Sequence, residues 1–511
     1  MKHTISILAL TVTCLTTSVK ASADTFYVDS IRYQSLSSNT CEVIEYYFAK
    51  YKGDIVIPEQ VEYKPVNPKE QRVLYTVVGI GDEAFSRCEE LTSISIPGSV
   101  TTIGNNAFEN CTALTNATLN EGLVSIGNGA FSNCSTLTGI NIPRSVTTME
   151  REAFYEYTAL AHAKFPDNSG ITAIEAKTFY GCTSLKEINI SNGITVVEDN
   201  AFRGCTNLER ISFPKSVTKI KDEAFCGCTS LKYVDLGYVS AVFTRAFAKC
   251  PQLTNVVVSR GTPDDNAVLF GAEEAFEDSH IKNVEVPSDA SLIPNRLFSP
   301  RSMVTVDTLT IATNKLTIEC YEDEQWRTIS PKYIRYAYGV TDATGHFESS
   351  NLCTIDFPES LIYVHATFTD CDSLESVTLP DGVIYIDSKV FKDCENLTDV
   401  HLPASLRAIP DDAFNKTAIQ HIDIPDGVRT IGDGAFANSA LNDVTLPKGI
   451  TAIGNSAFSG CSSLERINIP ESVTTIGEEA FYRCSSLESL SIPESVTSVG
   501  ADAFSMCPLL I

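Results

Sequence analysis

The chain has 511 residues, of which 64 are acidic and 38 are basic, so its formal net charge is −26. This charge repels phosphate backbones and anionic lipid headgroups, which argues against nucleic acid as a partner. The acidic residues are spread along the whole length, a pattern typical of a long solvated surface. Beyond the first residues no stretch approaches the ~20 apolar residues of a membrane-spanning helix, so we expect no integral membrane span.

The N-terminal residues have the features of an export signal. Lys2 precedes an apolar run over residues 5–15, and an Ala-Ser-Ala sequence follows at residues 21–23. A basic start, an apolar stretch and small residues at the cleavage point predict a secretory signal peptide over residues 1–23. We therefore expect a secreted or cell-surface protein. Cys14 leaves a lipid-anchored form open, and a periplasmic location is also compatible with export.

Residues 24–53 alternate apolar and polar side chains and are rich in Tyr, Val and Ile. This period of two predicts half-buried strands joined in hairpins. A stack of repeated units exposes an apolar face at its first unit unless another segment covers it. We expect residues 24–53 to form a small β-rich cap at the N-terminal end.

A phenylalanine, usually preceded by alanine, recurs every 22 or 23 residues through most of the remaining chain. The series is Phe85, Phe108, Phe131, Phe154, Phe179, Phe202, Phe225, Phe247, Phe276, Phe298, Phe368, Phe391, Phe414, Phe436, Phe458, Phe481 and Phe504. Such a period is typical of a solenoid, in which each unit, or rung, buries its apolar face against its neighbours. The chain is therefore predicted to be one elongated stack, although its length alone would suggest several domains.

Each rung has the same internal order, as in LERINIPESVTTIGEEAFYRC over residues 464–484. The Ile-x-Ile alternation places two apolar side chains inward, and the proline ends the strand because it cannot donate a hydrogen bond. Val and Ile of the next segment point to a second inward face, with Gly at the turn. Ala-Phe-x-x-Cys then predicts a short helical turn whose Phe fills the interior. We expect one short parallel strand per rung and a continuous spine of Phe rings.

The rungs fall into two blocks separated by an irregular segment. The first block covers residues 54–311 and the second covers residues 352–511, while residues 312–351 lack an Ala-Phe pair and hold the single tryptophan, Trp326. We interpret this segment as an irregular rung with a looped insertion or, alternatively, as a binding loop, because aromatic residues on long loops often carry function. The sequence ends in Cys-Pro-Leu-Leu-Ile without an evident cap, so self-association through the C-terminal rung is a further expectation.

The 17 cysteines would ordinarily indicate a disulfide framework in an exported protein. Twelve of them lie three residues after a repeat Phe, namely Cys88, Cys111, Cys134, Cys182, Cys205, Cys228, Cys250, Cys371, Cys394, Cys461, Cys484 and Cys507. Other rungs place Tyr, Ser, Arg or Thr in this slot, a scattered replacement that a pairing scheme would not tolerate. We expect mostly buried free thiols. Occasional disulfides between neighbouring rungs stay open, as does a pair of Cys320 with Cys353.

The unit I-P-x-S-V-T-x-I-G-x-x-A-F-x-x-C-x-x-L resembles the BspA-like leucine-rich-repeat family of bacterial surface proteins. The residues that carry the resemblance include Ile469-Pro470, Ser472-Val473-Thr474, Ile476-Gly477, Ala480-Phe481, Cys484 and Leu487. The match extends over nearly all of residues 54–511, apart from the irregular middle. The resemblance implies a leucine-rich-repeat solenoid, a right-handed superhelix of the β/α type. It also implies a secreted or cell-surface adhesion protein that binds host matrix proteins or other cells.

Residues for catalysis or cofactor binding are hard to assemble from this sequence. Gly79-Ile80-Gly81 followed by Ala84 imitates a dinucleotide-binding fingerprint, but the same spacing arises from the repeat turn and lacks the strand-helix-strand setting. The sequence has no phosphate-binding loop, no zinc spacing of Cys or His, and no Gly-x-Ser-x-Gly elbow. We expect no enzymatic activity and no cofactor.

Three successive rungs of the second block carry His and Asp at strand positions that should point outward. In register they form the columns Asp399, His421, Asp443 and His401, Asp423, Thr445. Alternating His and carboxylate groups at strand spacing are compatible with a metal site, with a site that orients a ligand, and with cross-strand charge pairing, which is the commonest case.

The outward strand positions as a whole are the predicted ligand surface, because Tyr and Arg are typical anchors of protein interfaces. The candidate residues are Arg210, Tyr233, His401, His421, Asp423 and Arg466, together with Trp326 of the irregular segment. We expect recognition of, or adhesion to, an extracellular protein of a host matrix or another cell. The alternative is capture of a carbohydrate or nutrient beside an uptake system, although aromatic platforms for sugar stacking are sparse on this strip.

Overall fold

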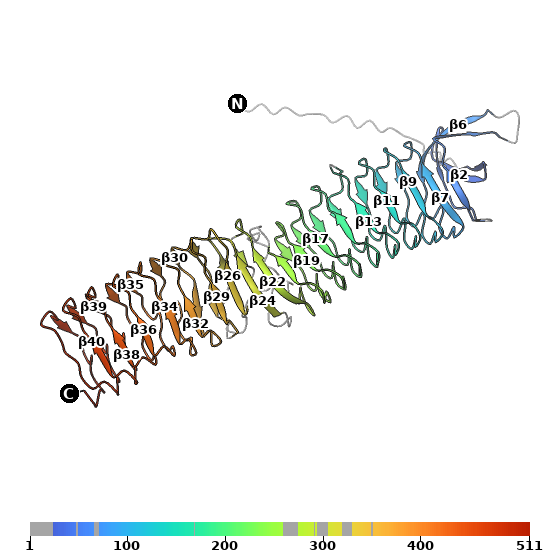
Figure 1. The fold of residues 1–511 in the computed structure, drawn as a ribbon. Coiled ribbons are helices and arrows are strands. Elements are labelled where there is room, and N and C mark those ends of the chain that lie inside the picture. The colour runs from blue at the N-terminus through green and yellow to red at the C-terminus, as the bar shows by residue number, and fades with distance from the viewer. Residues whose placement is uncertain are drawn as a thin grey trace, which may run out of the picture.

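The computed structural model describes residues 24–47, 50–65, 71–167, 169–258, 274–290, 292–293, 305–318, 330–348 and 351–510. These residues form one elongated stack of rungs with a small sheet at its N-terminal end (Figure 1). Every regular element in these ranges is a β-strand, and they contain no helix that could cross a membrane. The prediction of a repeat solenoid is confirmed.

A first parallel ladder runs along one face of the stack (Figure 1). Side chains alternate along each strand, so that Ile140 is buried between the exposed Gly139 and Asn141. Neighbouring strands pair in parallel register, for example Ile140 with Ala163. The strands are β4 (Gly53–Val56), β7 (Leu91–Ile96), β9 (Asn116–Leu119), β11 (Gly139–Asn141), β13 (His162–Lys164), β15 (Glu187–Asn189), β17 (Arg210–Ser212), β19 (Tyr233–Asp235), β21 (Asn255–Val257), β22 (His280–Val286), β24 (Thr305–Ile311), β26 (Tyr333–Tyr336), β29 (Thr354–Asp356), β32 (Ser376–Thr378), β34 (Asp399–His401), β36 (His421–Asp423), β38 (Asp443–Thr445) and β40 (Arg466–Asn468).

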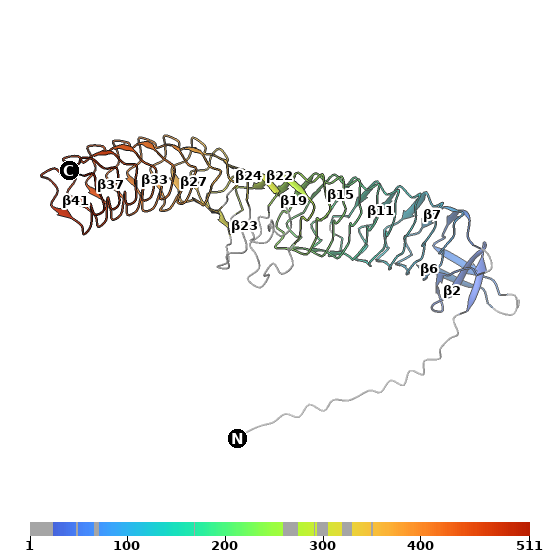
Figure 2. The same ribbon diagram turned by 90° about the horizontal axis from the view of Figure 1, so that it is seen from below.

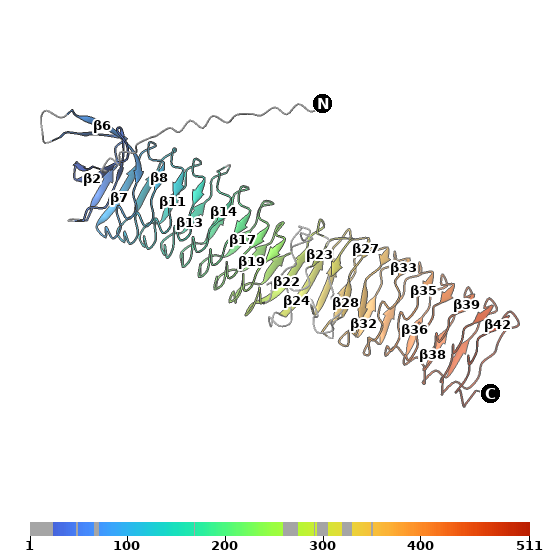
Figure 3. The ribbon, with the colours of Figure 1, turned by 180° about the vertical axis from the view of Figure 1, so that it is seen from behind.

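A second parallel ladder lies on the opposite side of the stack (Figure 3). The expected strand in each rung is thus joined by another, usually of two residues, where the Val-Thr-x-Ile-Gly segment buries its Ile. The strands are β6 (Val73–Ile80), β8 (Thr102–Ile103), β10 (Ser125–Ile126), β12 (Thr148–Met149), β14 (Ala173–Ile174), β16 (Val196–Val197), β18 (Lys219–Ile220), β20 (Ala241–Val242), β23 (Leu292–Ile293), β25 (Thr317–Ile318), β27 (Asp342–Ala343), β30 (Tyr363–Val364), β33 (Tyr385–Ile386), β35 (Ala408–Ile409), β37 (Thr430–Ile431), β39 (Ala452–Ile453), β41 (Thr475–Ile476) and β42 (Ser498–Val499).

The Ala-Phe-x-x-Cys segment is a turn and not the short helical turn that we expected. Glu83 and Arg87 flank Phe85 with φ angles of 55° and 58°, which interrupt the right-handed conformation that a helix needs. The N–H groups bond instead to the next rung, since Phe85 N donates to Ala107 O at 2.7 Å and Arg87 N donates to Glu109 O at 2.7 Å. The turns therefore form a third line of hydrogen bonds between rungs.

The repeat Phe rings stack into the expected spine, with neighbouring ring centroids 4.9–5.9 Å apart. Burial of one such side chain contributes ~1.5–3 kcal/mol. Phe347 also belongs to the spine, because it stacks on Phe368 at 5.3 Å although no Ala precedes it. Phe298 lies outside the described residues.

The cysteines in the described ranges are free and mostly buried, so the prediction of buried thiols is confirmed. Cys205 Sγ donates to Phe179 O of the preceding rung at 3.2 Å, and most other ladder cysteines make the equivalent bond. Ser279 Oγ donates to Phe247 O in the same way at 3.4 Å. The slot thus holds a small donor for a buried carbonyl. Of the separate pair considered above, Cys353 is free and exposed and Cys320 lies outside the described residues.

The N-terminal sheet sits on the first rung (Figure 2). Its strands β1 (Thr25–Val28), β2 (Ile31–Ser35) and β3 (Thr40–Val43) are antiparallel, and β3 joins the second ladder by pairing in parallel with β6. A further strand, β5 (Gln60–Tyr63), pairs antiparallel with β6. The buried Tyr51 packs its ring 4.7 Å from that of Phe85, so aromatic stacking continues from the spine into this segment.

Residues 330–348 form a rung within the segment that looked irregular in sequence. Strand β26 pairs with β24 and β29 on the first ladder, and β27 pairs with β30 on the second. Strand β28 (His346–Glu348) pairs with β31 (Thr367–Thr369) at the Phe turn. Both ladders therefore have a strand in this rung. Trp326 lies outside the described residues.

Candidate ligand-binding surface

The outward residues of the first ladder form two columns along the stack, which we call the outward strip. It consists of the first and third residues of the three-residue strands and their equivalents in longer strands. Parallel register aligns Gly139, His162 and Glu187 in one column. Asn141, Lys164 and Asn189 are aligned in the other. The interior constrains the central residue of each strand and leaves these positions free to vary.

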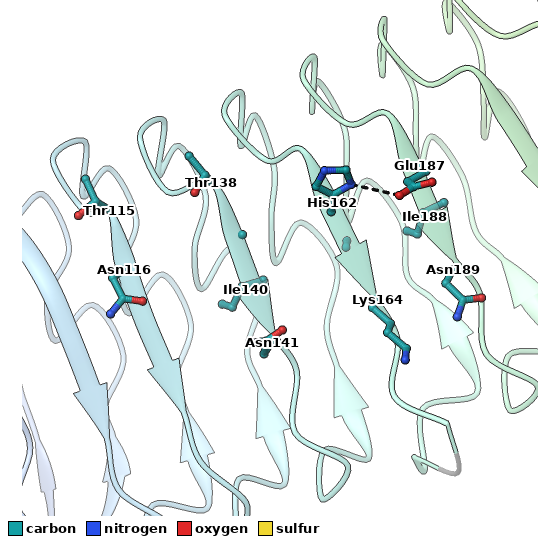
Figure 4. Close-up of a pocket in the computed structure, with 12 residues that line it drawn as sticks. Thr115, Asn116, Thr138, Ile140, Asn141, His162, Lys164, Glu187, Ile188 and Asn189 are labelled. Carbon is teal, nitrogen blue, oxygen red and sulfur yellow. Dashed lines mark ion pairs between the residues drawn. The ribbon is translucent and has the colours of Figure 1, made fainter.

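A shallow groove of about 650 Å³ crosses the outward strip over β9, β11, β13 and β15 (Figure 4). Gly139 opens this groove, because Asn116 and His162 stand on either side of a position that has no side chain. A Cβ atom added at Gly139 would meet nothing within 4 Å. The volume of the groove is in the range of small-ligand sites, ~300–1,000 Å³.

Amide, hydroxyl and charged groups line the groove, and its lining includes no Phe, Tyr or Trp. Asn116, Asn141 and Asn189 offer both donors and acceptors. His162 Nδ1 lies 3.4 Å from Glu187 Oε1, and both side chains are well exposed (Figure 4). Such an exposed pair adds little to stability, so these two side chains are available to a ligand.

The predicted anchors Arg210 and Tyr233 lie on the same column, on the first and second rungs beyond the groove. Their strands pair in register, and Arg210 Cζ lies 5.4 Å from the centre of the Tyr233 ring. A guanidinium over an aromatic face is attracted by the ring quadrupole, which holds the Tyr ring in place. Arg210, Tyr233 and the groove therefore form one continuous polar and aromatic surface.

The His and Asp columns of the second block lie side by side on the outward strip. Register pairs His421 with Asp443 and Asp423 with Thr445, as predicted. His421 Nε2, however, lies 3.3 Å from Asp423 Oδ1 of its own strand. No three His, Cys, Asp or Glu side chains in the described residues come close enough together to hold a metal. Outward side chains of neighbouring strands project side by side, which favours charge pairing over the alternative of a metal site.

The remaining predicted residues that the structure describes occupy the C-terminal part of the strip. Asp399 and His401 are exposed on β34, where they pair with Ser376 and Thr378. Arg466 is exposed on β40 and aligned with Asp443. The structure therefore places these residues on the predicted surface without gathering them into a pocket.

Sequence reasoning missed the residues that shape the groove. Gly139 stands in a strand position where other rungs carry a polar or charged side chain, and this exchange was the available signal. Lys164 and the three Asn residues looked like ordinary solvated strand residues. Only the packing of four successive rungs, spaced 23 or 25 residues apart in the chain, makes them neighbours.

Comparison with known proteins identifies the repeat. The chain matches the family described as BspA type leucine rich repeat region, in six copies, over residues 59–171, 172–305, 343–442 and 407–511. No curated protein matches the chain.

Among solved structures, a leucine rich cell surface protein from Faecalibacterium prausnitzii A2-165 is 24% identical, with 94% of this chain and 95% of that chain covered and a TM-score of 0.39. A leucine-rich repeat protein from Bacteroides ovatus ATCC 8483 is 23% identical over 92% of this chain and 95% of that chain, also with a TM-score of 0.39. Because the family match spans most of the sequence, the chain belongs to the BspA-type leucine-rich-repeat proteins.

Proposed function

We propose that this chain is an exported, non-enzymatic recognition protein whose outward strip binds an extracellular protein of a host matrix or another cell. The observation that carries the proposal is the continuity of the groove at Gly139 with the Arg210–Tyr233 pair on one exposed column. Arg and Tyr are enriched among the residues that dominate the free energy of protein interfaces. A strip that spans many rungs also allows several weak contacts to act together.

Export and surface location belong to the same proposal. The signal-like residues 1–23 and membership of the BspA-type family support a secreted or cell-surface protein. We assign binding as the activity and no cofactor.

A glycan is the second candidate ligand, and the amide-rich lining of the groove favours it. Asn116, Asn141 and Asn189 suit sugar hydroxyls, which both donate and accept hydrogen bonds. The lack of Phe, Tyr and Trp in the lining argues in the other direction, because sugar rings are usually bound by stacking on such rings as well as by hydrogen bonds.

A groove-filling substitution tests the proposal. Gly139→Tyr should fold normally, because the position is open to solvent, while its ring should block the groove. We expect binding to immobilised fibronectin, laminin or collagen to fall at least tenfold in this variant and in Arg210→Ala. Thr430→Tyr, at an exposed position of β37 on the second ladder and outside the outward strip, is the matched control and should bind like the parent.

Purified neutral and acidic glycans form the second arm of the same measurement. Binding to glycans alone would overturn the protein-ligand proposal in favour of the second candidate. Equal protein binding by the parent and by Gly139→Tyr would remove the groove from the site.

A further inference from the structure

An aromatic cluster stands on the second ladder, away from the outward strip. Tyr363 and Tyr385 are aligned in the parallel register of β30 and β33, and their inward neighbours Val364 and Ile386 are buried like those of other rungs. In the described strands of this ladder, no other residue at the equivalent outward position is aromatic. Stacking of the rungs therefore does not require these two tyrosines.

His365 joins the two tyrosine rings into one cluster. Its ring centre lies 5.9 Å from that of Tyr363 and 5.1 Å from that of Tyr385. The cluster remains open to solvent, since Tyr363 is 39% exposed, Tyr385 is 42% exposed and the adjacent Ile384 is 42% exposed. Single exposed apolar residues are common, but a cluster of them on one face is typical of a binding surface.

Two carboxylates flank the rings and hold them in place. Asp342 Oδ1 lies 2.8 Å from His365 Nδ1, and the Tyr385 hydroxyl donates to Asp387 Oδ1 at 3.2 Å. Burial and the neighbouring Asp387 raise the pKa of Tyr385, so its hydroxyl stays protonated as the donor. These contacts engage Oδ1 of each carboxylate and leave Oδ2 available to a ligand.

The charge around the cluster favours a cationic ligand. Glu359 and Asp381 are exposed in the turns that lead into β30 and β33, and they add to the negative charge of the two aspartates. The Arg407 guanidinium on the next rung donates to Ala404 O and Leu406 O of its own rung. Ammonium and guanidinium groups are attracted both by carboxylates and by aromatic faces.

We propose that Tyr363, His365 and Tyr385, with Asp342 and Asp387, form a second docking site that takes a basic, apolar segment of a partner protein. A Lys or Arg side chain of the segment pairs with the carboxylates beside the rings, and its apolar neighbours pack on Ile384 and the tyrosines. A neutral glycan would stack on the rings but would gain no binding free energy from the carboxylates. The site lies on the other ladder and does not depend on the function proposed for the outward strip.

Fluorine NMR of the full chain labelled with 3-fluorotyrosine tests this site, with resonances assigned through Tyr363→Phe and Tyr385→Phe. The probes are the peptides acetyl-Arg-Leu-Arg-Leu-amide and acetyl-Glu-Leu-Glu-Leu-amide and the neutral sugar maltoheptaose. We expect the basic peptide to shift both resonances and to bind at least tenfold more tightly than the acidic peptide. The double variant Asp342→Asn/Asp387→Asn should weaken this binding at least fivefold.

Tyr333→Ala is the matched control, because Tyr333 is similarly exposed, at 48%, but lies on the first ladder. This variant and Gly139→Tyr should bind the basic peptide like the parent, which separates the site from the outward strip. The proposal is overturned by equal binding of the two peptides, by shifts with maltoheptaose alone, by unchanged binding in the Asp double variant, or by no response of either resonance to any probe.

Discussion

The buried spine and the outward strip run along the same rungs but vary in different ways. Inside, Phe follows Phe at a nearly constant spacing, and the thiol slot repeats a small hydrogen-bond donor. Outside, one column passes through Gly139, His162 and Glu187 and then through Arg210 and Tyr233. The difference shows that stacking constrains what faces inward and leaves the outward chemistry free for recognition.

Alkaline pH should have the largest effect on stability, because it acts on the buried thiols of the interior. Burial raises the pKa of Cys134 and of Cys250 to about 12 and that of Cys461 to about 11, against an ordinary value of 9.0. A thiol whose pKa is raised by folding stabilises the fold fully below pH 9, and this contribution is lost as the pH rises above 9. Each such thiol lowers the free energy of unfolding by up to ~1.4 kcal/mol per pH unit between pH 9 and its pKa in the folded protein.

The measurement is the free energy of urea unfolding between pH 7 and pH 11. It should be nearly constant up to pH 8.5 and should then fall steeply. Cys134→Ser removes one buried thiol. The free energy of unfolding of this variant should therefore fall less steeply with pH, by the contribution of about one titrating proton. A stability that stays flat to pH 11 would contradict the assignment of buried thiols.

Removal of one ring from the spine should have the next largest effect. Phe225 stacks between Phe202 and Phe247, and Phe225→Ala leaves a cavity between two rungs. We expect a loss of about 3–5 kcal/mol, typical of a buried Phe. Hydrogen exchange of the β18 and β20 amides would locate the loss. A change below about 1 kcal/mol would show that the rungs close the cavity by themselves.

The thiol slot offers a finer test of what the interior requires. Cys205→Ala removes one of two hydrogen bonds to Phe179 O, which still accepts from Cys182 N at 3.2 Å, so we expect a loss of about 0.5–1.5 kcal/mol. Cys205→Ser keeps a donor, as Ser279 does beneath Phe247, and should cost less than Cys205→Ala. Urea unfolding of the two variants measures the difference. Equal losses would mean that the slot needs only a small volume.

Substitution on the outward strip should have the smallest effect on stability. Tyr233→Ala removes a cation–π contact with Arg210, worth about 0.5–1 kcal/mol at an exposed site. Thermal unfolding should therefore change little, while affinity for the protein ligand should fall at least tenfold. A large loss of stability with unchanged affinity would show that Tyr233 stabilises the fold and does not bind the ligand.

Much of the fold was predictable because each rung repeats the same pattern of residues. Phe225 and Phe481 carry the same Ala before them and the same Cys after them, so the period and the buried face follow from local sequence. The helical turn was a wrong prediction, since the left-handed backbone at residues such as Arg87 follows from hydrogen bonds to the next rung. Phe347 was missed because His precedes it in place of Ala.

The sequence by itself determined the stack, its spine and its outward columns, because the same pattern of apolar and polar residues recurs in every rung. Tertiary structure alone decided the sites. The groove at Gly139 exists only where its neighbours across the ladder retain their side chains. The cluster at Tyr363 arises because parallel register brings Tyr385, 22 residues away in sequence, onto the same column. Contacts between rungs depend on register, and register becomes fixed only when the rungs pack.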